Sequence, residues 1–286
     1  MSHTATTTIS RYFTNTRGKA LSTGWFGLSS AEFLLPITII YALTVIDWRN
    51  IWIIISIFIV LFLPVVSYFL VKEIKLSSRE NDIKFIKNNI KNWKRSEVIR
   101  DYRFIIVALN MLAMPCIVTG IFVYQSFILT SKNWGEYIIA QSFMVYSVSS
   151  VLTLFVAGYL IDKFTSRKLL IYMNIPLLIS LLILIYFQSP LSSFFFLGLI
   201  GLSNGFANVL GSSTWAELYG VKFIGSIKAL SGALMVFSTA FGTALFGLLI
   251  DLNFSLEQIS VICSAYILIS LLLLLLIKNK LNPTIV

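Results

Sequence analysis

The sequence has few charged residues and little of the chemistry that enzymes use. Only 12% of its 286 residues are charged, whereas 57% are hydrophobic. A soluble domain of this length could not bury so much apolar surface, so the composition excludes a soluble fold and predicts an integral membrane protein. The sequence also lacks a Walker loop, a cluster of metal-ligand residues and a nucleophile next to a base. We therefore expect no enzyme, no catalytic residues, no cofactor and no metal.

Cysteine is scarce as well. Cys116 and Cys263 both fall inside apolar runs, where a thiol is typical of a small packing residue and not of a disulfide or a metal site. The formal net charge of +10 could suggest nucleic acid, but the basic residues lie between apolar runs. There they set orientation and meet anionic lipid headgroups. The expected partner is the lipid bilayer, and nucleic acid is not expected.

Eight apolar runs are long enough to cross about 30 Å of hydrocarbon as helices. They cover residues 19–43, 51–71, 104–129, 138–162, 168–187, 192–214, 228–250 and 258–277. Residues 1–13 have no signal-peptide core and fit the last half of a helix that ends at Arg11. The predicted fold is all-α and polytopic, with eight full transmembrane helices and a partial N-terminal one.

Ten of the 22 Lys and Arg residues lie in one segment, Lys72–Arg103. Basic residues near helix ends stay in the cytoplasm, and placing this segment there leaves only Arg49 and Lys132 on the outer side. The expected location is the plasma (inner) membrane, with this segment and the C-terminus cytoplasmic. Its apolar spacing over Ile83–Trp93 favours a helix on the inner leaflet, and a solvated linker is the alternative.

The tetrapeptide Lys-Ala-Leu-Ser occurs twice, at Lys19–Ser22 and at Lys228–Ser231. Both copies stand at the predicted cytoplasmic start of a membrane helix, which favours two related halves, as in transporters built of parallel repeats. The offset between the copies predicts that about 105 residues, or three helices and most of a fourth, are missing before residue 1.

The segment Gly158–Lys168 reads GYLIDKFTSRK. It resembles the loop signature of the major facilitator superfamily: a Gly, three residues, an Asp, a basic residue and then a basic cluster. The matching positions are Gly158, Asp162, Lys163 and Arg167. Thr165 stands where the pattern prefers Gly. Further resemblances are Arg17–Ala20 entering the fifth family helix, Trp48–Arg49 before the sixth and Ala216–Leu218 leaving the tenth.

The resemblance implies the last two-thirds of a twelve-helix transporter, nearest to the monocarboxylate-type branches. Residues 1–71 would be the remnant of an N-terminal bundle (the end of helix 4, and helices 5 and 6), 72–103 a linker and 104–286 a six-helix bundle. It implies secondary active transport of a small solute by alternating access, as a symporter or antiporter. A non-transporting membrane fragment stays the alternative, because half of a two-bundle machine cannot enclose a site.

Asp162 is expected at the inner end of its helix, where the negative helix terminus disfavours it. It therefore needs a positive partner, either Arg167 or the N-terminus of another helix. The resemblance implies that this other helix is the one that starts at Gly18–Lys19. The second contact would latch one conformation through Gly158, Asp162, Lys163 and Arg167. An ordinary charged turn is the alternative.

Polar residues at helical spacing predict an aqueous pathway, with ordinary helix packing as the alternative. The predicted pathway residues are Glu32, Asn110, Tyr124, Gln125, Tyr146, Asn204 and Asn208. Desolvation would raise the pKa of Glu32, so this residue is either a proton carrier or a tie to the adjoining helix, with His3 as its partner. No Lys or Arg is expected at mid-membrane, so an anionic solute would need either a cation from the segment expected to be missing before residue 1 or backbone dipoles.

Overall fold

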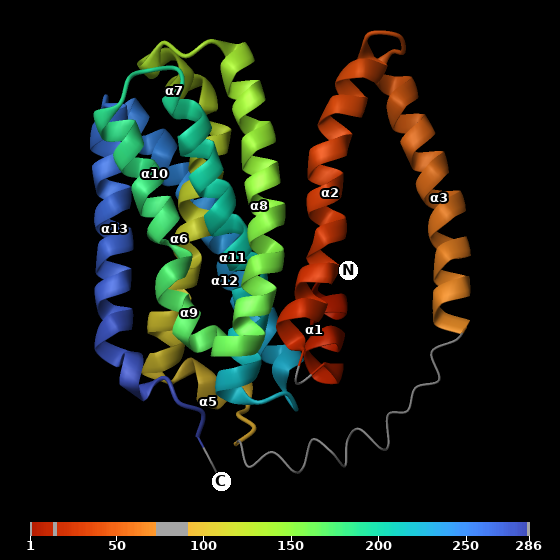
Figure 1. The fold of residues 1–286 in the computed structure, drawn as a ribbon, viewed down its shortest axis with the longest axis vertical. Helices are drawn as coiled ribbons and strands as arrows, with labels where there is room; N and C mark the ends of the chain where they lie inside the picture. The colour runs from red at the N-terminus through yellow and green to blue at the C-terminus, as the bar shows by residue number, and fades with distance from the viewer. Residues whose placement is uncertain (1, 14–15, 73–90, 285–286) are drawn as a thin grey trace. The chain divides into compact units, whose positions relative to one another are not determined.

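The structure is a computed structural model that describes residues 2–13, 16–72 and 91–284. Its regular elements in these ranges are all helices (Figure 1). In chain order they are α1 (Ser2–Tyr12), α2 (Arg17–Leu43), α3 (Trp48–Lys72), α5 (Arg95–Ile99), α6 (Tyr102–Val123), α7 (Gln125–Lys132), α8 (Glu136–Phe164), α9 (Ser166–Met173), α10 (Ile175–Tyr186), α11 (Ser192–Tyr219), α12 (Ile224–Asp251), α13 (Leu256–Ile277) and the short 3₁₀ helix η1 (Lys278–Lys280).

Seven segments of the described chain are long and apolar enough to cross a membrane as helices. They are Trp48–Val66, Tyr102–Val123, Gln141–Phe164, Ser166–Tyr186, Ser192–Tyr219, Ile224–Asp251 and Leu256–Lys280. An all-helical membrane fold is therefore confirmed for these residues. The count of eight full helices and one partial helix stays a prediction, and the surface helix over Ile83–Trp93 falls mostly outside the described residues.

The chain divides into two compact units, residues 1–29 with 90–286, and residues 30–89. The second unit contains α3, whose described side chains are nearly all exposed and apolar. Such a surface suits a helix that lipid surrounds. The first unit contains α1, the start of α2 and all helices from α5 to α13, and the candidate site lies within it.

Two buried clusters hold the start of α2 and the end of α11 in place. Leu21 of α2 is fully buried with Leu154 and Val209, so the first turns of α2 pack against α8 and α11. Trp215 and Tyr219 of α11 belong to a second cluster. We call this part of the first unit, where α2 begins, α8 ends and α5 lies, the basic end (Figure 1).

Helices α8 and α11 approach each other closely. A Cβ added at Gly201 of α11 would overlap the backbone of Tyr146 in α8, so only glycine permits this separation. Close packing through small residues is the usual way in which membrane helices associate. It fixes the rotation of α11, and with it the direction of the polar side chains that follow Gly201.

Candidate functional site: a cavity and a helix contact at the basic end

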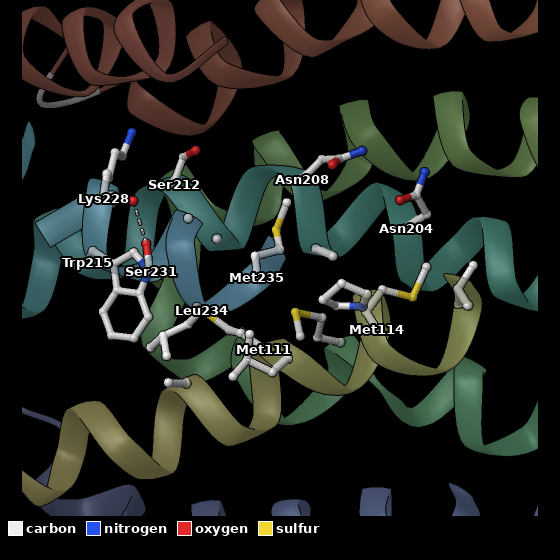
Figure 2. Close-up of a pocket in the computed structure, with 18 of the residues that line it drawn as sticks. Met111, Met114, Asn204, Asn208, Ser212, Trp215, Lys228, Ser231, Leu234 and Met235 are labelled. Carbon is white, nitrogen blue, oxygen red and sulfur yellow. Dashed lines mark hydrogen bonds between the residues drawn. The ribbon is translucent and has the colours of Figure 1, made fainter. Parts of the chain in front are cut away.

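A cavity of about 410 Å³ lies between α6, α11 and α12, and residues of α1, α2 and α9 also line it (Figure 2). This volume falls in the range of roughly 300–1,000 Å³ that is typical of sites for small organic ligands. Its lining residues are Thr6, Trp25, Ala108, Met111, Leu112, Met114, Pro115, Val118, Thr119, Phe122, Met173, Asn204, Ala207, Asn208, Gly211, Ser212, Trp215, Lys228, Ser231, Gly232, Leu234 and Met235.

Polar and apolar side chains occupy different sides of this cavity. Asn204, Asn208 and Ser212 are four residues apart on α11, and Figure 2 shows them in one row. Their spacing corresponds to about 6 Å along the helix per step. The opposite side carries Met111 and Met114 of α6 with other apolar residues. The lining therefore suits a ligand with one polar side and one apolar side.

Two of the predicted pathway residues, Asn204 and Asn208, thus line the cavity. Asn204 also donates from Nδ2 to Ser150 Oγ of α8 at 3.0 Å, which fixes its amide against the neighbouring helix. Asn208 is half-buried. Its amide has no hydrogen-bond partner among the described residues, and a polar group beside an apolar wall is a typical determinant of ligand orientation.

Lys228 stands at one end of the polar row, and its side chain is buried with only 5% exposed. Its ammonium donates to the carbonyl oxygen of Thr6 at 2.9 Å and to Ser10 Oγ at 3.0 Å, both in α1. None of the ion pairs between described residues includes Lys228. Lys228 is therefore a buried cation whose hydrogen-bond acceptors are both neutral.

The sequence prediction missed Lys228 because it assigned this residue to the cytoplasmic start of a helix. Helix α12 begins at Ile224, a full turn earlier than predicted. Ile224 and Ile227 are fully buried, and their packing carries the helix N-terminus past the lysine. The available signal was this apolar pair before Lys228, which indicates a helical turn and not a solvated loop.

At the same end, Asp162 of α8 accepts hydrogen bonds from the first residues of α2. Its Oδ1 lies 2.7 Å from the amide nitrogen of Gly18, and its Oδ2 lies 3.1 Å from that of Lys19. These N–H groups have no partner within their own helix, and the helix dipole favours a negative charge there. Of the two predicted partners for Asp162, the structure thus has the helix N-terminus.

Glycine makes this contact possible. A Cβ added at Gly158 would lie 2.6 Å from Ser22 Oγ and 2.8 Å from the carbonyl oxygen of Gly18, and one added at Gly18 would overlap the carbonyl oxygen of Gly158. The two helices therefore cross with their backbones touching. The Gly158–Asp162 spacing of one helical turn places the carboxylate beside the crossing point.

Among the remaining predicted pathway residues whose side chains the structure describes, none lines the cavity. Asn110 is fully buried, and its side-chain amide donates to the backbone carbonyl oxygen of Leu170 at 3.3 Å. The backbone carbonyl oxygen of Asn110 accepts from Asn174 Nδ2 at 2.6 Å. Helix α9 ends at Met173, because Pro176 has no N–H to continue the helical hydrogen bonds and its ring crowds the carbonyl four residues earlier. Asn110 bonds to polar groups at this break.

Tyr124 and Gln125 lie where α6 ends and α7 begins. Tyr146 contacts Phe122 edge-on, with ring centroids 5.6 Å apart. Glu32 belongs to α2, but its side chain and that of His3 lie outside what the structure describes. The structure thus brings Asn204 and Asn208 together and leaves the other predicted pathway residues apart from the cavity or unplaced.

The described part of the basic segment, from Lys91 onward, forms a separate polar cluster at the basic end. Glu97 accepts from the amide nitrogen of Lys94 at 2.7 Å and from Lys91 Nζ at 2.9 Å, and these bonds lower the pKa of Glu97. Asp101 caps α6 and pairs with Arg103 at 2.8 Å. These groups satisfy one another and do not line the cavity.

A family model of the Major Facilitator Superfamily matches residues 1–242 and residues 122–284 of this sequence. The chain belongs to the Major Facilitator Superfamily. No curated protein matches it significantly. Membership confirms the resemblance drawn from the loop signature. Because members of this superfamily are membrane transporters and not enzymes, the chain is an integral membrane protein of the transporter class.

Within the superfamily's loop signature, Arg167 and Thr165 have roles that the sequence alone did not separate. Arg167 donates from Nη1 to the carbonyl oxygen of Leu281 at 2.6 Å and lies 3.5 Å from Glu217, so it anchors the C-terminal residues and not Asp162. Thr165 joins α8 to α9 with φ 73° and ψ 145°. Glycine adopts this backbone conformation readily, which explains the preference of the superfamily for Gly at this place.

Lys163, another member of the signature, is exposed, and its Nζ lies 5.3 Å from the centroid of the Phe164 ring. Its charge therefore remains at the surface of the basic end. In this superfamily chain Gly158, Asp162 and the backbone of residues 18 and 19 make the polar contact between α2 and α8.

Proposed function

We propose that this chain works in a secondary active transporter that moves a small solute by alternating access. The observation that carries the proposal is the cavity, since Thr6 and Trp25, on the N-terminal side of the basic segment, line it together with α6, α11 and α12. Alternating access requires two bodies that rock about a shared site. A cavity lined by residues from both sides of the linker supports this proposal, in which Asn204 and Asn208 are the solute-facing amides.

The contact between Asp162 and the start of α2 is the proposed latch. It ties α8 to α2 at the basic end, which by the distribution of Lys and Arg is the cytoplasmic end in the plasma (inner) membrane. While the contact holds, the cavity is separated from the cytoplasm. Release of the two N–H groups lets the start of α2 move away from α8.

The reactivity of a single cysteine tests alternating access without knowledge of the solute. Cys116 and Cys263 are replaced by alanine, and Asn208→Cys is reconstituted in lipid vesicles. We expect a membrane-impermeant thiol reagent to modify this cysteine from either face, because the cavity opens to each in turn. Leu272→Cys on α13 is the control, since Leu272 is 59% exposed on an apolar surface and should react from neither face. Modification of Asn208→Cys from one face only would contradict the proposal.

Proton coupling through Glu32 is the finer part of the proposal. A carboxylic acid within an apolar helix is costly to ionise, so it suits a group that binds and releases a proton during the cycle. Glu32→Gln should abolish accumulation of the solute against its gradient and leave exchange intact, because the amide cannot titrate. Uptake and counterflow in proteoliposomes, with and without a pH gradient, separate the two activities. A role as a structural tie would reduce both in parallel.

A further inference from the structure

Lys228 is the one charged side chain among the described residues that line the cavity. An ammonium has three donors, and two of those of Lys228 go to the Thr6 carbonyl and the Ser10 hydroxyl. Both acceptors are neutral. The third N–H of the ammonium has no acceptor among the described residues.

The carboxylates at the basic end are already engaged. Asp162 accepts from the backbone of α2, and Glu217 accepts from the amide nitrogen of Ser166 at 3.0 Å and lies near Arg167. Arg17 lies close enough to repel Lys228 electrostatically, and its own charge interacts with Glu217 and Asp162. The Lys228 end of the cavity thus has a buried positive charge and no adjacent described negative charge.

A buried cation is costly unless a charge of opposite sign accompanies it. A ligand with an acidic group would supply that charge from the cavity side. A cationic ligand would instead meet repulsion from both Lys228 and Arg17. A neutral ligand would leave the ammonium with its two neutral acceptors.

We propose that the cavity binds an organic anion, with its acidic group on the Lys228 ammonium and its apolar body against Met111, Met114 and Leu234. The inference rests on the proposed function, because it names the solute class of the same cavity. Figure 2 shows Lys228 at one end of the row that Asn208 and Ser212 continue, with the apolar side chains on the other side. Asn208 and Ser212 provide neutral polar groups for the second oxygen of a carboxylate.

The proposal assigns each side of the cavity a part in recognition. The third donor of the ammonium binds the acid, while the other two stay with Thr6 and Ser10. The volume of about 410 Å³ admits a small molecule and not a peptide or a lipid. The methionines are flexible and polarisable, so they can pack against apolar groups of several shapes. The charge of the ligand therefore determines binding more strictly than its shape does.

A matched pair of probes tests this assignment, namely 4-phenylbutyrate and its uncharged amide, 4-phenylbutyramide. They are titrated into the purified full chain in lipid nanodiscs, and binding is followed by tryptophan fluorescence, because Trp25 and Trp215 line the cavity. A hydrogen bond to a charged group predicts that the acid binds about 10- to 150-fold more tightly than the amide. Lys228→Met should reduce this ratio to less than about twofold, and Lys228→Arg should retain most of it.

Lys222→Met is the control for charge alone, since Lys222 is outside the cavity lining and close in sequence. It should leave the ratio unchanged. Equal affinity of the wild-type chain for acid and amide, no detectable binding of the acid, or a preference that survives Lys228→Met would each overturn the proposal. The wild-type comparison needs no mutant, so the test holds even if Lys228→Met fails to fold.

Exchange of labelled 4-phenylbutyrate in proteoliposomes separates this inference from the proposed function. If the acid binds in a Lys228-dependent manner but does not exchange, the anion site is confirmed and the proposal that this chain transports a solute is wrong. If a neutral solute exchanges equally in the wild-type chain and in Lys228→Met, transport is confirmed and the anion site is overturned.

Discussion

Replacement of Asp162 by asparagine tests the contact between α2 and α8 with the least change of shape. The carboxylate accepts from the amide nitrogens of Gly18 and Lys19 at 2.7 and 3.1 Å. Asparagine has one oxygen that can accept and one NH₂ group that donates. It therefore keeps at most one of the two bonds, places a donor against the other N–H group and removes the charge that the helix N-terminus favours.

The size of the effect follows from this geometry. A hydrogen bond to a charged group contributes about 1.5–3 kcal/mol, and a charge at a helix N-terminus about 0.3–1 kcal/mol, although the two overlap in one contact. Asp162 is half-buried, so water offsets part of the loss and the lower half of that range applies. We expect a loss of about 1.5–2 kcal/mol, which corresponds to a roughly 10- to 30-fold larger population with the contact open.

The assay is the rate at which Ser212→Cys reacts with a thiol reagent, in a chain whose two native cysteines are alanine. Ser212 lines the cavity and is only 8% exposed, so its reaction requires opening. When opening and closing are fast compared with the reaction, the rate is proportional to the open population. Asp162→Asn should raise the rate by about 10- to 30-fold. Lys163→Gln should change it less than about twofold, because Lys163 is exposed and makes no bond to α2 in the structure.

An unchanged rate in Asp162→Asn would refute the reasoning, since it would mean that the two hydrogen bonds do not hold the basic end closed. A rise of the same size in Lys163→Gln would also refute it. That result would show that the net charge of the loop, and not the contact with the α2 backbone, controls opening.

Three further substitutions have outcomes that thermal unfolding in detergent can measure. Gly158→Ala should lower stability by about 1–3 kcal/mol through overlap with α2, whereas Gly27→Ala, which meets no atom within 4 Å, should be neutral or slightly stabilising. Thr165→Gly should raise stability by about 1 kcal/mol because it relieves the strain at φ 73°, and a lower melting temperature would contradict this. Glu257→Gln should cost more than Lys132→Met, because it leaves the buried Lys132 ammonium without its partner at 3.0 Å, whereas Glu257 is 39% exposed; equal costs would contradict this.

Hydropathy predicted the membrane helices well because a helix that crosses lipid must satisfy its backbone internally and present about 20 apolar residues. The same reasoning placed the start of α12 a turn too late. It took Lys228 as a solvated charge, whereas groups of α1 more than 200 residues away in sequence satisfy that ammonium. No local pattern contains such a partner.

Two of the three predicted asparagine sites show the same limit. Asn110 and Asn208 both lie on otherwise apolar helices, and periodicity gives the face of each helix but not the neighbour that the face meets. Asn208 faces the cavity, whereas Asn110 meets the break before Asn174. The break itself was predictable from Pro176, since a proline has no N–H to donate to the carbonyl four residues earlier and its ring crowds that carbonyl.

The two polar contacts at the basic end share a property that suits a latch. Asp162 and Lys228 are both held by uncharged groups of residues 1–29: two backbone N–H groups in one case, a carbonyl and a hydroxyl in the other. Opening a buried salt bridge would strand two charges, which is strongly unfavourable. Opening these contacts strands one charge each, and the neutral partners cost less to expose.

In both cases another group can stabilise the charge that remains after the contact opens. Asp162 is half-buried at the basic end, so water can solvate its carboxylate once α2 moves. Lys228 is buried beside the cavity, and the acidic group of a bound anion would replace the acceptors that α1 withdraws. Opening of the Lys228 contact would then be easier with the anion bound than without it, because a ligand shifts a conformational equilibrium by its difference in affinity for the two states. If the proposed anion binds there, the arrangement of these two charges would connect solute binding to movement of α1 and α2.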